Sequence, residues 1–501
     1  MAPYLPSNDD NHSGSRYYYA SLGSLGNAVM VWQTNGRMLF AAIAALVFGG
    51  VAQAKDPVLT TPTPQNESAE PEQQPSISTS VPALGEFKKA LLDLGYNLQL
   101  NYTGEVLGNP SGGVYQGGIY EGLLEMSIDG DLNKIAGLKG ATFHVNAYEI
   151  HGRGLTTYNI FNYSTISGIE ARRTTRLFEL WVEQELFDGM AAIRLGQLSA
   201  DTEFILSDLD ALYFNGTYGW PNITSINLPG TGPHYPVSTP GVRLKFTPND
   251  KLMFLLGVFN GDPAGVGLDT ARTEYANTAG INFRLRDPPL VIAEGQFKYT
   301  LPVTPEGLDG KLRVGGWRHF GNFDDIYNGI DGLSIVDPSG AGAPIVHSGD
   351  YGIYSIVDQM IWRKPGNDPK KGVGVYAFGM FCPPDRNLVQ FDLQAGVNFT
   401  GMWDLRPNDI FGAAASLTNL SPSARALDRA TRFYADPFTP IRSYELQFEV
   451  TYQAQIVPGL IVQPDFQYVH FPGAGAANPI DSRLGKIPDA AVFGLRVGAK
   501  F

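Results

Sequence analysis

The sequence predicts an all-β fold: a transmembrane antiparallel β-barrel of about sixteen strands with a short N-terminal helix. Three observations predict it. Long segments alternate apolar and polar residues with a period of two, short turns alternate with long loops, and the chain ends in the alternating run AVFGLRVGAKF. This period places apolar side chains on one face of a strand and polar ones on the other. In a membrane barrel the apolar face meets lipid and the polar face meets a wet interior.

The composition fits a β-protein with many turns. Only 17% of the 501 residues are charged, 12% are aromatic and 58 are glycine. Glycine serves turns, and aromatic residues favour strands. The net charge of −13 argues against a nucleic-acid partner. The single cysteine, Cys382, excludes an intrachain disulfide and a zinc site built from several cysteines.

The N-terminal part carries a targeting signal. Arg37 precedes the apolar run MLFAAIAALVFGGVAQA at 38–54, which ends in a small-x-small pattern. The run is shorter than the roughly 20 residues that a helical membrane span needs. We therefore expect residues 1–54 to be an N-terminal extension followed by a cleaved signal peptide, with Met30 or Met38 as alternative starts.

Two short regions separate this signal from the strands. Residues 55–82 are rich in Pro, Ser, Thr, Gln and Glu, so we expect a flexible linker. Residues 83–94 follow a helical period and predict a short amphipathic helix. Its apolar stripe is Leu84, Phe87, Leu91 and Leu94. Residues 95–501 are then expected to form the barrel.

The candidate strands run for roughly ten residues or more, and about 9–11 tilted residues cross a bilayer. A soluble sandwich also alternates, but it needs neither this length nor loops of such unequal size. Clear examples begin at Tyr96, Phe178, Val242, Ile281, Val389 and Tyr444. The long loops are expected at 199–239, 260–277, 321–350, 418–441 and 471–489.

The number of candidate strands is odd, which does not fit a closed antiparallel barrel. We find about seventeen candidates, whereas bacterial single-chain barrels use even numbers. The count fails between residues 286 and 351, where the turn LPVTPEGLDG and the loop 321–350 cannot both lie on the outer side. We expect sixteen strands, with eighteen as the alternative.

The charges expected to face the interior are segregated along the chain. In a ring of sixteen, strands eight apart face each other, so a basic wall would oppose a later acidic wall and set a transverse field across the pore. Individually, these charges could simply be solvated. The basic set is Arg194, Arg243, Lys245, Arg284, Arg286 and Arg313, and the acidic set is Asp392, Glu445, Glu449 and Asp465, with Glu179, Glu183 and Glu185 preceding the basic residues.

The stretch 194–236 is long and rich in aromatic residues, and it follows an early strand. We expect it to fold into the interior and narrow it, with an external cap as the alternative. It combines carboxylates, an amide and flat rings, the groups that sugars require for hydrogen bonding and stacking. These are Asp201, Glu203, Asn215, Tyr218 and Trp220.

Eight segments carry a further signal, in this order along the chain: RLGQLSADTEF, YFNGTYGWP, GVRLKF, GVFNGDP, GGWRHFGNFDD, GDYGIYSIVDQMIWRKPG, PPDRNLVQFDLQAGVNFTG and YELQFEVTYQAQIVPGLIVQPDFQYV. Together they resemble the OprB family of carbohydrate-selective outer-membrane porins. The resemblance covers most of residues 90–501. It implies a sixteen-stranded barrel in the outer membrane of a Gram-negative bacterium that passes monosaccharides, glucose above all, by diffusion.

The resemblance also implies an eyelet, the narrowest part of the channel, lined by arginine, glutamate and aromatic side chains. Arg194, Glu183 and Trp181 fit it by type and inferred facing. The wider candidate set adds Asp201, Glu203, Asn215, Trp220, Arg243 and Arg284. The terminal Phe501 resembles the C-terminal signature that the barrel assembly machinery reads.

Other functions have less support. No nucleophile motif accompanies the seven histidines and no metal-ligand spacing occurs, so we expect neither an enzyme nor a cofactor. An energised receptor would need a plug domain, for which the region before the strands is too short. A general or ion-selective porin with the same barrel is the main alternative. Oligomeric state is left open.

Overall fold

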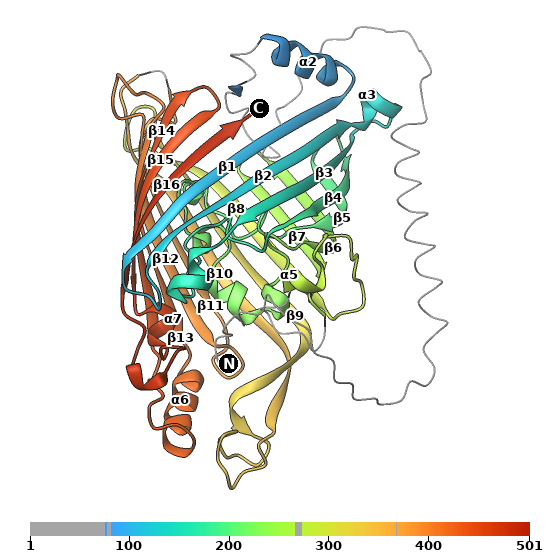
Figure 1. Ribbon diagram of the computed structural model, residues 1–501. Helices are drawn as coiled ribbons and strands as arrows, with labels where there is room; N and C mark the ends of the chain where they lie inside the picture. The colour runs from blue at the N-terminus through green and yellow to red at the C-terminus, as the bar shows by residue number, and fades with distance from the viewer. Residues whose placement is uncertain (1–75, 78–81, 266–272, 367) are drawn as a thin grey trace, which may run out of the picture.

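Sixteen strands close into one antiparallel barrel, in which every strand pairs with its sequence neighbours and β1 pairs with β16 (Figure 1). This confirms the expected fold and strand number. The computed structural model describes residues 76–77, 82–265, 273–366 and 368–501. The expectations for residues 1–54 and for most of 55–82 lie outside this part of the chain.

The strands are β1 Tyr96–Ser111, β2 Gly117–Asp131, β3 Ala141–Gly152, β4 Thr174–Leu186, β5 Ala191–Leu198, β6 Thr239–Asn249, β7 Leu252–Asn260, β8 Pro289–Leu301, β9 Leu308–Gly329, β10 Pro344–Arg363, β11 Gly372–Phe381, β12 Val389–Thr400, β13 Ile410–Leu420, β14 Tyr444–Val457, β15 Leu460–His470 and β16 Ala490–Lys500. The helical segments are α2 Pro82–Asp93, α3 Leu132–Ala136, η2 Thr156–Ile160, η3 Asp210–Leu212, η4 Gly216–Tyr218, α4 Asn222–Asn227, η5 Pro229–Thr231, α5 Thr273–Ala276, α6 Pro422–Tyr434, α7 Pro472–Gly475 and η7 Ser482–Leu484. None of the described helices is long and apolar enough to cross a membrane.

The final strand shows how the alternation is used. Phe493 is 56% exposed and Leu495 45% exposed on the outer surface of β16. Arg496, between outward residues, turns inward and donates from Nε to Glu105 of β1 at 2.6 Å. The apolar face therefore points outward to lipid and the polar face points into the barrel.

The two ends of the barrel differ. Helix α2 and the C-terminus lie at the end with the short turns, at the top of Figure 1, and α6 lies at the opposite end among the long loops. Outer-membrane barrels have short periplasmic turns and long external loops. The short-turn end is therefore the periplasmic end. Helix α2 corresponds to the helix expected over 83–94 and begins one residue earlier.

One of the seventeen candidate strands, at residues 281–286, was wrong. Residues 281–286 form no ladder and belong to the link between β7 and β8. The backbone N–H of Arg284 donates to the carbonyl of Asn282 at 2.9 Å, which bends the segment. Two prolines follow, and a proline cannot donate a ladder hydrogen bond. Three alternating apolar residues were too short a signal to establish a strand.

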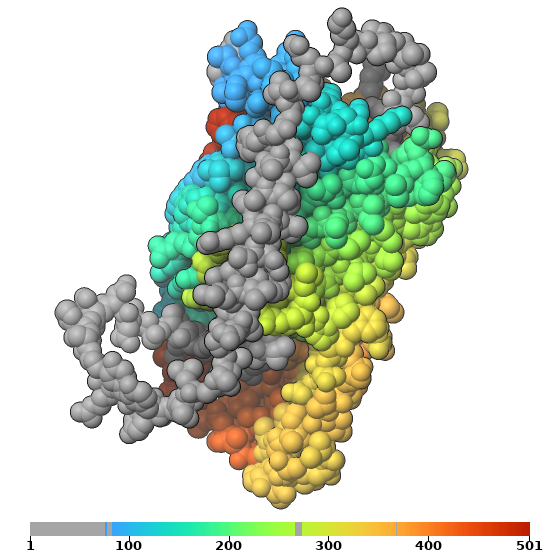
Figure 2. Space-filling view, turned by 90° about the vertical axis from the view of Figure 1, so that its right-hand side faces the viewer, coloured from blue at the N-terminus to red at the C-terminus, as the bar shows by residue number. Residues whose placement is uncertain are grey.

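The loop expected at 321–350 is shorter than predicted. β9 has 22 residues and β10 has 20, so the hairpin extends past the barrel rim before it turns over 330–343. Figure 2 shows this extension, in yellow, projecting below the wall of green strands. The turn LPVTPEGLDG is correspondingly the short periplasmic link between β8 and β9.

A β-bulge corrects one inferred facing. Asn146 of β3 pairs with Glu179 of β4, but Ala147 pairs with Leu177, which leaves Phe178 as an extra residue. Phe178 is buried, and its ring centroid lies 4.7 Å from that of Tyr148. Simple alternation predicted a lipid-facing Phe178.

Candidate functional site

The link from β5 to β6, residues 199–238, folds into the barrel; we call it the inner loop. Its hydrogen bonds reach wall residues far away in the sequence. Asn398 of β12 accepts a bond from the Tyr213 hydroxyl at 2.7 Å, and Gln463 of β15 donates to the carbonyl of Leu212 at 2.8 Å. This confirms that the stretch narrows the interior and does not form an external cap.

Wall carboxylates hold the backbone of the inner loop. Glu449 of β14 accepts the backbone N–H groups of Phe214 at 2.6 Å and Asn215 at 3.1 Å. A charged acceptor strengthens such bonds. Three further wall carboxylates act in the same way: Glu179 accepts from Ser199 at 2.8 Å, Glu294 from Ile205 at 3.1 Å and Asp392 from Ile223 at 3.3 Å.

These contacts correct the expected transverse field. Asp392, Glu445 and Glu449 are each at most 1% exposed. Glu445 accepts backbone N–H groups of the β3–β4 link, at 2.9 Å from Tyr163 and 2.7 Å from Ser164. The later acidic wall is therefore covered by loops and does not present bare charge to the channel.

Glycines on the wall make room for apolar side chains of the inner loop. A Cβ atom added at Gly257 or Gly374 would lie 3.0 Å from Phe204 or from Leu209, respectively. One added at Gly412 would lie closer than 3.0 Å to Leu212. The loop thus packs into holes that only glycine leaves open.

A charged cluster forms where the start of the inner loop meets β4, β5 and β6. Arg194 is directly opposite Glu183 in the ladder and donates to it from Nε at 2.8 Å. Arg243 donates from Nη2 to Glu183 at 2.6 Å and from Nε to Glu203 of the inner loop at 2.6 Å. Arg194 Nη1 also lies 3.3 Å from Glu203. We call these four residues, together with Trp181, the eyelet cluster.

The eyelet cluster has a buried part and an accessible part. The side chain of Arg243 is 1% exposed, whereas those of Arg194 and Glu203 are 13% and 21% exposed. Buried charges require partners, and Arg243 has two carboxylates. Arg194 and Glu203 therefore have the more accessible side chains, and Arg243 lies behind them.

Trp181 does not offer a free ring face. His144 of β3 stacks on it with centroids 5.0 Å apart, and the guanidinium carbon of Arg194 of β5 lies 3.7 Å from its ring centroid. The two neighbours come from the strands on either side of β4. The His144 ring and the Arg194 guanidinium thus both pack against the indole of Trp181.

Comparison with known proteins shows to which family the chain belongs. The family model described as carbohydrate-selective porin, OprB family, matches residues 115–501. The chain belongs to the OprB family. It is therefore an outer-membrane carbohydrate porin of the Gram-negative type, a passive channel and not an enzyme.

Individual relatives agree with this OprB assignment. Porin B of Pseudomonas aeruginosa is 24% identical over 438 residues, which span 83% of this chain and 90% of the relative. The putative porin QuiX of Acinetobacter baylyi is 24% identical over 441 residues, 83% of this chain and 92% of the relative. The high-pH structure of Pseudomonas putida OprB superposes with a TM-score of 0.73 at 23% identity, covering 83% of this chain and 97% of that one.

Three other candidate residues of this OprB porin make contacts within the protein. Asn215 is 2% exposed and donates to Gln467 at 3.0 Å. Trp220 is 4% exposed, and its Nε1 donates to the carbonyl of Thr231 at 3.1 Å. Asp201 accepts the backbone N–H of Tyr235 at 2.8 Å, which closes the loop on itself.

Two further residues of the predicted basic wall lie outside it. Arg284 pairs with Asp287 within the β7–β8 link, and Arg286 lies in the same strandless segment. Hydrogen bonding from Arg284 and Asn260 outweighs burial and lowers the pKa of Asp287. Neither arginine is part of the eyelet cluster.

Sequence reasoning missed a second charged group. Arg313 of β9 pairs with Asp208 of the inner loop and with Asp358 of β10, and Lys311 Nζ lies 3.3 Å from Asp208. Arg313 was expected to face inward, but the contribution of the loop was not anticipated. The sequence signal for this charged group was the spacing of Lys311 and Arg313, which are two residues apart and so lie on the same face of β9. Basic residues of the wall therefore form ion pairs with two carboxylates of the inner loop, Glu203 and Asp208.

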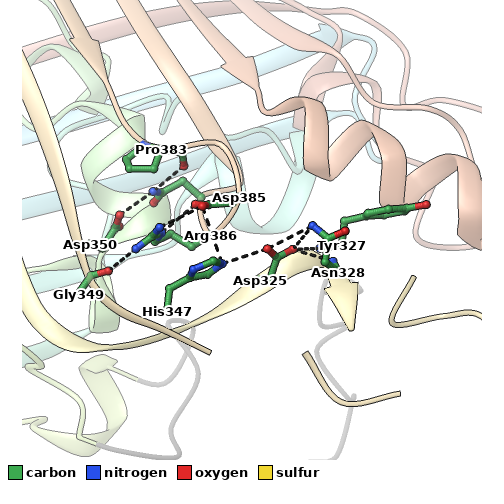
Figure 3. A network of polar contacts seen from close by, with 10 residues as sticks. Asp325, Tyr327, Asn328, His347, Gly349, Asp350, Pro383, Asp385 and Arg386 are labelled. Atoms are coloured by element: carbon green, nitrogen blue, oxygen red, sulfur yellow. Dashed lines mark hydrogen bonds and ion pairs between the residues drawn. The ribbon is translucent and has the colours of Figure 1, made fainter. Parts of the chain in front are cut away.

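A separate network ties the extended hairpin to the β11–β12 link (Figure 3). His347 of β10 lies between two carboxylates, with Nε2 3.0 Å from Asp325 and 3.9 Å from Asp385. Arg386 donates to Asp385 at 2.8 Å and to the carbonyl of Gly349 at 2.7 Å. Hydrogen bonding from Arg386 lowers the pKa of Asp385. In the described part of the chain, no group of three or more His, Cys, Asp or Glu could hold a metal ion.

Proposed function

We propose that this OprB-family porin passes monosaccharides, glucose among them, and that Arg194, Glu183 and Glu203 form the polar face of its eyelet. The observation that supports this most directly is the contact between wall and loop: Arg194 lies 2.8 Å from Glu183 and 3.3 Å from Glu203. The wall thus supplies a donor, Arg194, and an acceptor, Glu183, and the inner loop adds the acceptor Glu203 at the same place.

A sugar hydroxyl both donates and accepts hydrogen bonds. The guanidinium of Arg194 has only donors, and the carboxylate of Glu203 has only acceptors, so the pair matches both roles. Mutual pairing fixes these side chains before a solute arrives, which lowers the ordering cost of the contact. The paired charges also favour a neutral polar solute over an ion of either sign.

The mechanism is passive. A sugar exchanges part of its hydration for Arg194 and Glu203 contacts and leaves down its concentration gradient. Binding has to remain weak, because a conducting site must release its solute as readily as it takes it up. Trp181 contributes by holding Arg194 in place.

We also propose that Phe501 acts in assembly. Its backbone N–H donates to the carbonyl of Leu100 at 2.8 Å, so the last residue joins the seam between β1 and β16. Its side chain is 39% exposed. An aromatic ring at the closing seam is accessible to the assembly machinery as a terminal signal.

The first experiment compares osmotic swelling of proteoliposomes in glucose and in a zwitterionic amino acid of similar size at equal concentration. Clearly faster entry of glucose is expected. Equal rates for the two solutes would contradict monosaccharide preference and would indicate a general porin with the same barrel.

A further inference from the structure

A row of polar side chains lies on the inner face of β1, β2 and β3 near the periplasmic end. Glu125 accepts hydrogen bonds from Asn101 at 3.1 Å and from Asn146 at 2.8 Å. Asp129 lies 2.6 Å from His144 Nδ1 and accepts a longer bond from Gln99 at 3.4 Å. We call these six residues the β1–β3 row.

The inner loop is fixed to other strands. Its backbone is held by Glu294 of β8, Asp392 of β12 and Glu449 of β14. The hydrogen bonds given above for the β1–β3 row instead join its own members. All members of the row except the buried Asn146 are therefore partly exposed, whereas the wall carboxylates Asp392 and Glu449 are covered by the loop.

The row is connected to the eyelet cluster through one stacked residue. His144 binds Asp129 on one side and stacks on Trp181, with ring centroids 5.0 Å apart, on the other. Trp181 in turn lies against Arg194. The β1–β3 row and Arg194 are thus joined along the inner wall through His144 and Trp181.

Two observations indicate a ligand of hydrogen-bonding character. The side chain of Asp129 is 41% exposed, so its lone pairs are accessible. Asn146 is only 5% exposed, and its Oδ1 has no hydrogen-bond donor. A buried acceptor without a donor is costly, and a hydroxyl entering the row would relieve that cost.

We propose that the β1–β3 row is a second sugar-contact site beside the eyelet cluster, with Asp129 and Glu125 accepting sugar hydroxyls. This inference rests on the proposed monosaccharide function. Side-by-side amides and carboxylates present alternating donors and acceptors, as a ring of hydroxyls does. Two adjacent weak sites allow a solute to pass from one to the other without tight binding at either.

The test is the glucose dependence of single-channel current in planar bilayers. The double variant Asp129→Asn with Glu125→Gln preserves side-chain shape and removes both charged acceptors. We expect its half-saturating glucose concentration to rise roughly three- to tenfold, as charge-assisted hydrogen bonds are replaced by neutral ones. Asp250→Asn is the matched control, because Asp250 is an exposed carboxylate in the β6–β7 turn at the same end of the barrel.

The outcomes separate the two proposals. A rise in the double variant but not in Asp250→Asn supports the row. An unchanged half-saturating concentration in the double variant, together with a shift in Arg194→Ala, overturns the row and leaves the eyelet intact. A wild-type channel whose current does not respond to glucose overturns both. Resistance of the unheated barrel to SDS verifies that each variant is folded.

Discussion

The guanidinium carbon of Arg194 lies 3.7 Å from the ring centroid of Trp181, while its Nε donates to Glu183 at 2.8 Å. One planar group therefore uses its face for an aromatic ring and its edge for a carboxylate. Arginine suits this double role because its charge is spread over a rigid plane. The contact fixes the most accessible basic group of the eyelet cluster from two directions.

Replacing Arg194 by alanine should widen the eyelet and remove its donors. We expect faster entry of bulky solutes and a smaller difference between glucose and the amino acid in proteoliposome swelling. Arg432→Ala on α6 is the control, because Arg432 belongs to the external loops. Unchanged swelling rates in Arg194→Ala would remove this residue from the eyelet.

Replacing Glu203 by glutamine should weaken the attachment of the inner loop. Arg243 is 1% exposed and would lose one of its two charged partners. Breaking a buried ion pair costs about 3–5 kcal/mol, and the remaining Glu183 should keep the loss at or below about 3 kcal/mol. Denaturant unfolding in detergent measures it. Glu306→Gln, in the exposed β8–β9 turn, should change the free energy of unfolding little.

Adding one methyl group at Gly412 should push the inner loop off the wall. The new Cβ would collide with Leu212, and overpacking of this kind costs about 1–3 kcal/mol. We expect lower stability and larger fluctuations of the single-channel current. Gly118→Ala is a suitable comparison, since its added Cβ would be 3.7 Å from the nearest atom. Equal current noise in the two variants would argue against a loop held by glycine holes.

The rim network should persist to acidic pH. The pKa of Asp385 is lowered by hydrogen bonding from Arg386, so its contribution is complete above the ordinary aspartate pKa of about 3.9 and is lost as pH falls below it. A spin or fluorescent label at Ala341→Cys reports the mobility of the hairpin, since Cys382 is buried. Mobility should be constant from pH 7 to about 4 and rise below it. A rise in mobility that begins well above pH 4 would contradict control by Asp385.

Removing the terminal ring should affect assembly more than stability. Phe501→Ser keeps the backbone bond to Leu100. We expect less folded barrel in the outer membrane of cells, yet normal refolding from urea into detergent. Phe493→Ser changes an outward aromatic residue of the same strand and serves as the control. Equal membrane levels for wild type and Phe501→Ser would contradict an assembly role.

The barrel could be predicted from the sequence because the side of a strand on which a side chain lies follows from the local sequence pattern. In AVFGLRVGAKF the predicted alternation is seen from Phe493 onward, where Phe493, Leu495 and Val497 are exposed on the outer surface, whereas Val492 is buried. The same rule failed at Phe178, where a bulge inserts one residue, and at 281–286, where alternation occurs without a strand partner. Pairing partners decide both cases, and they are distant in sequence.

The site could be predicted only in part, because some of its residues meet through contacts between segments that are distant in the sequence. Glu183 and Arg194 meet because their strands are consecutive, so local pattern was sufficient. Trp220 and Asn215 carry suitable chemistry, but the inner loop uses them for its own packing. Asp208 gains its position from Arg313 of the distant strand β9, and His144 stacks on Trp181 of the neighbouring strand β4; residue type alone reveals neither contact.

The glycine holes restrict how this channel can be altered. Leu209 and Leu212 fit the wall only because β11 and β13 carry Gly374 and Gly412 beneath them. If residues 199–238 were replaced by the corresponding loop of a relative, the apolar side chains of the new loop would not match the positions of the wall glycines. New solute preferences should therefore arise through matched pairs of replacements, one in the new loop and one on the strand that receives it.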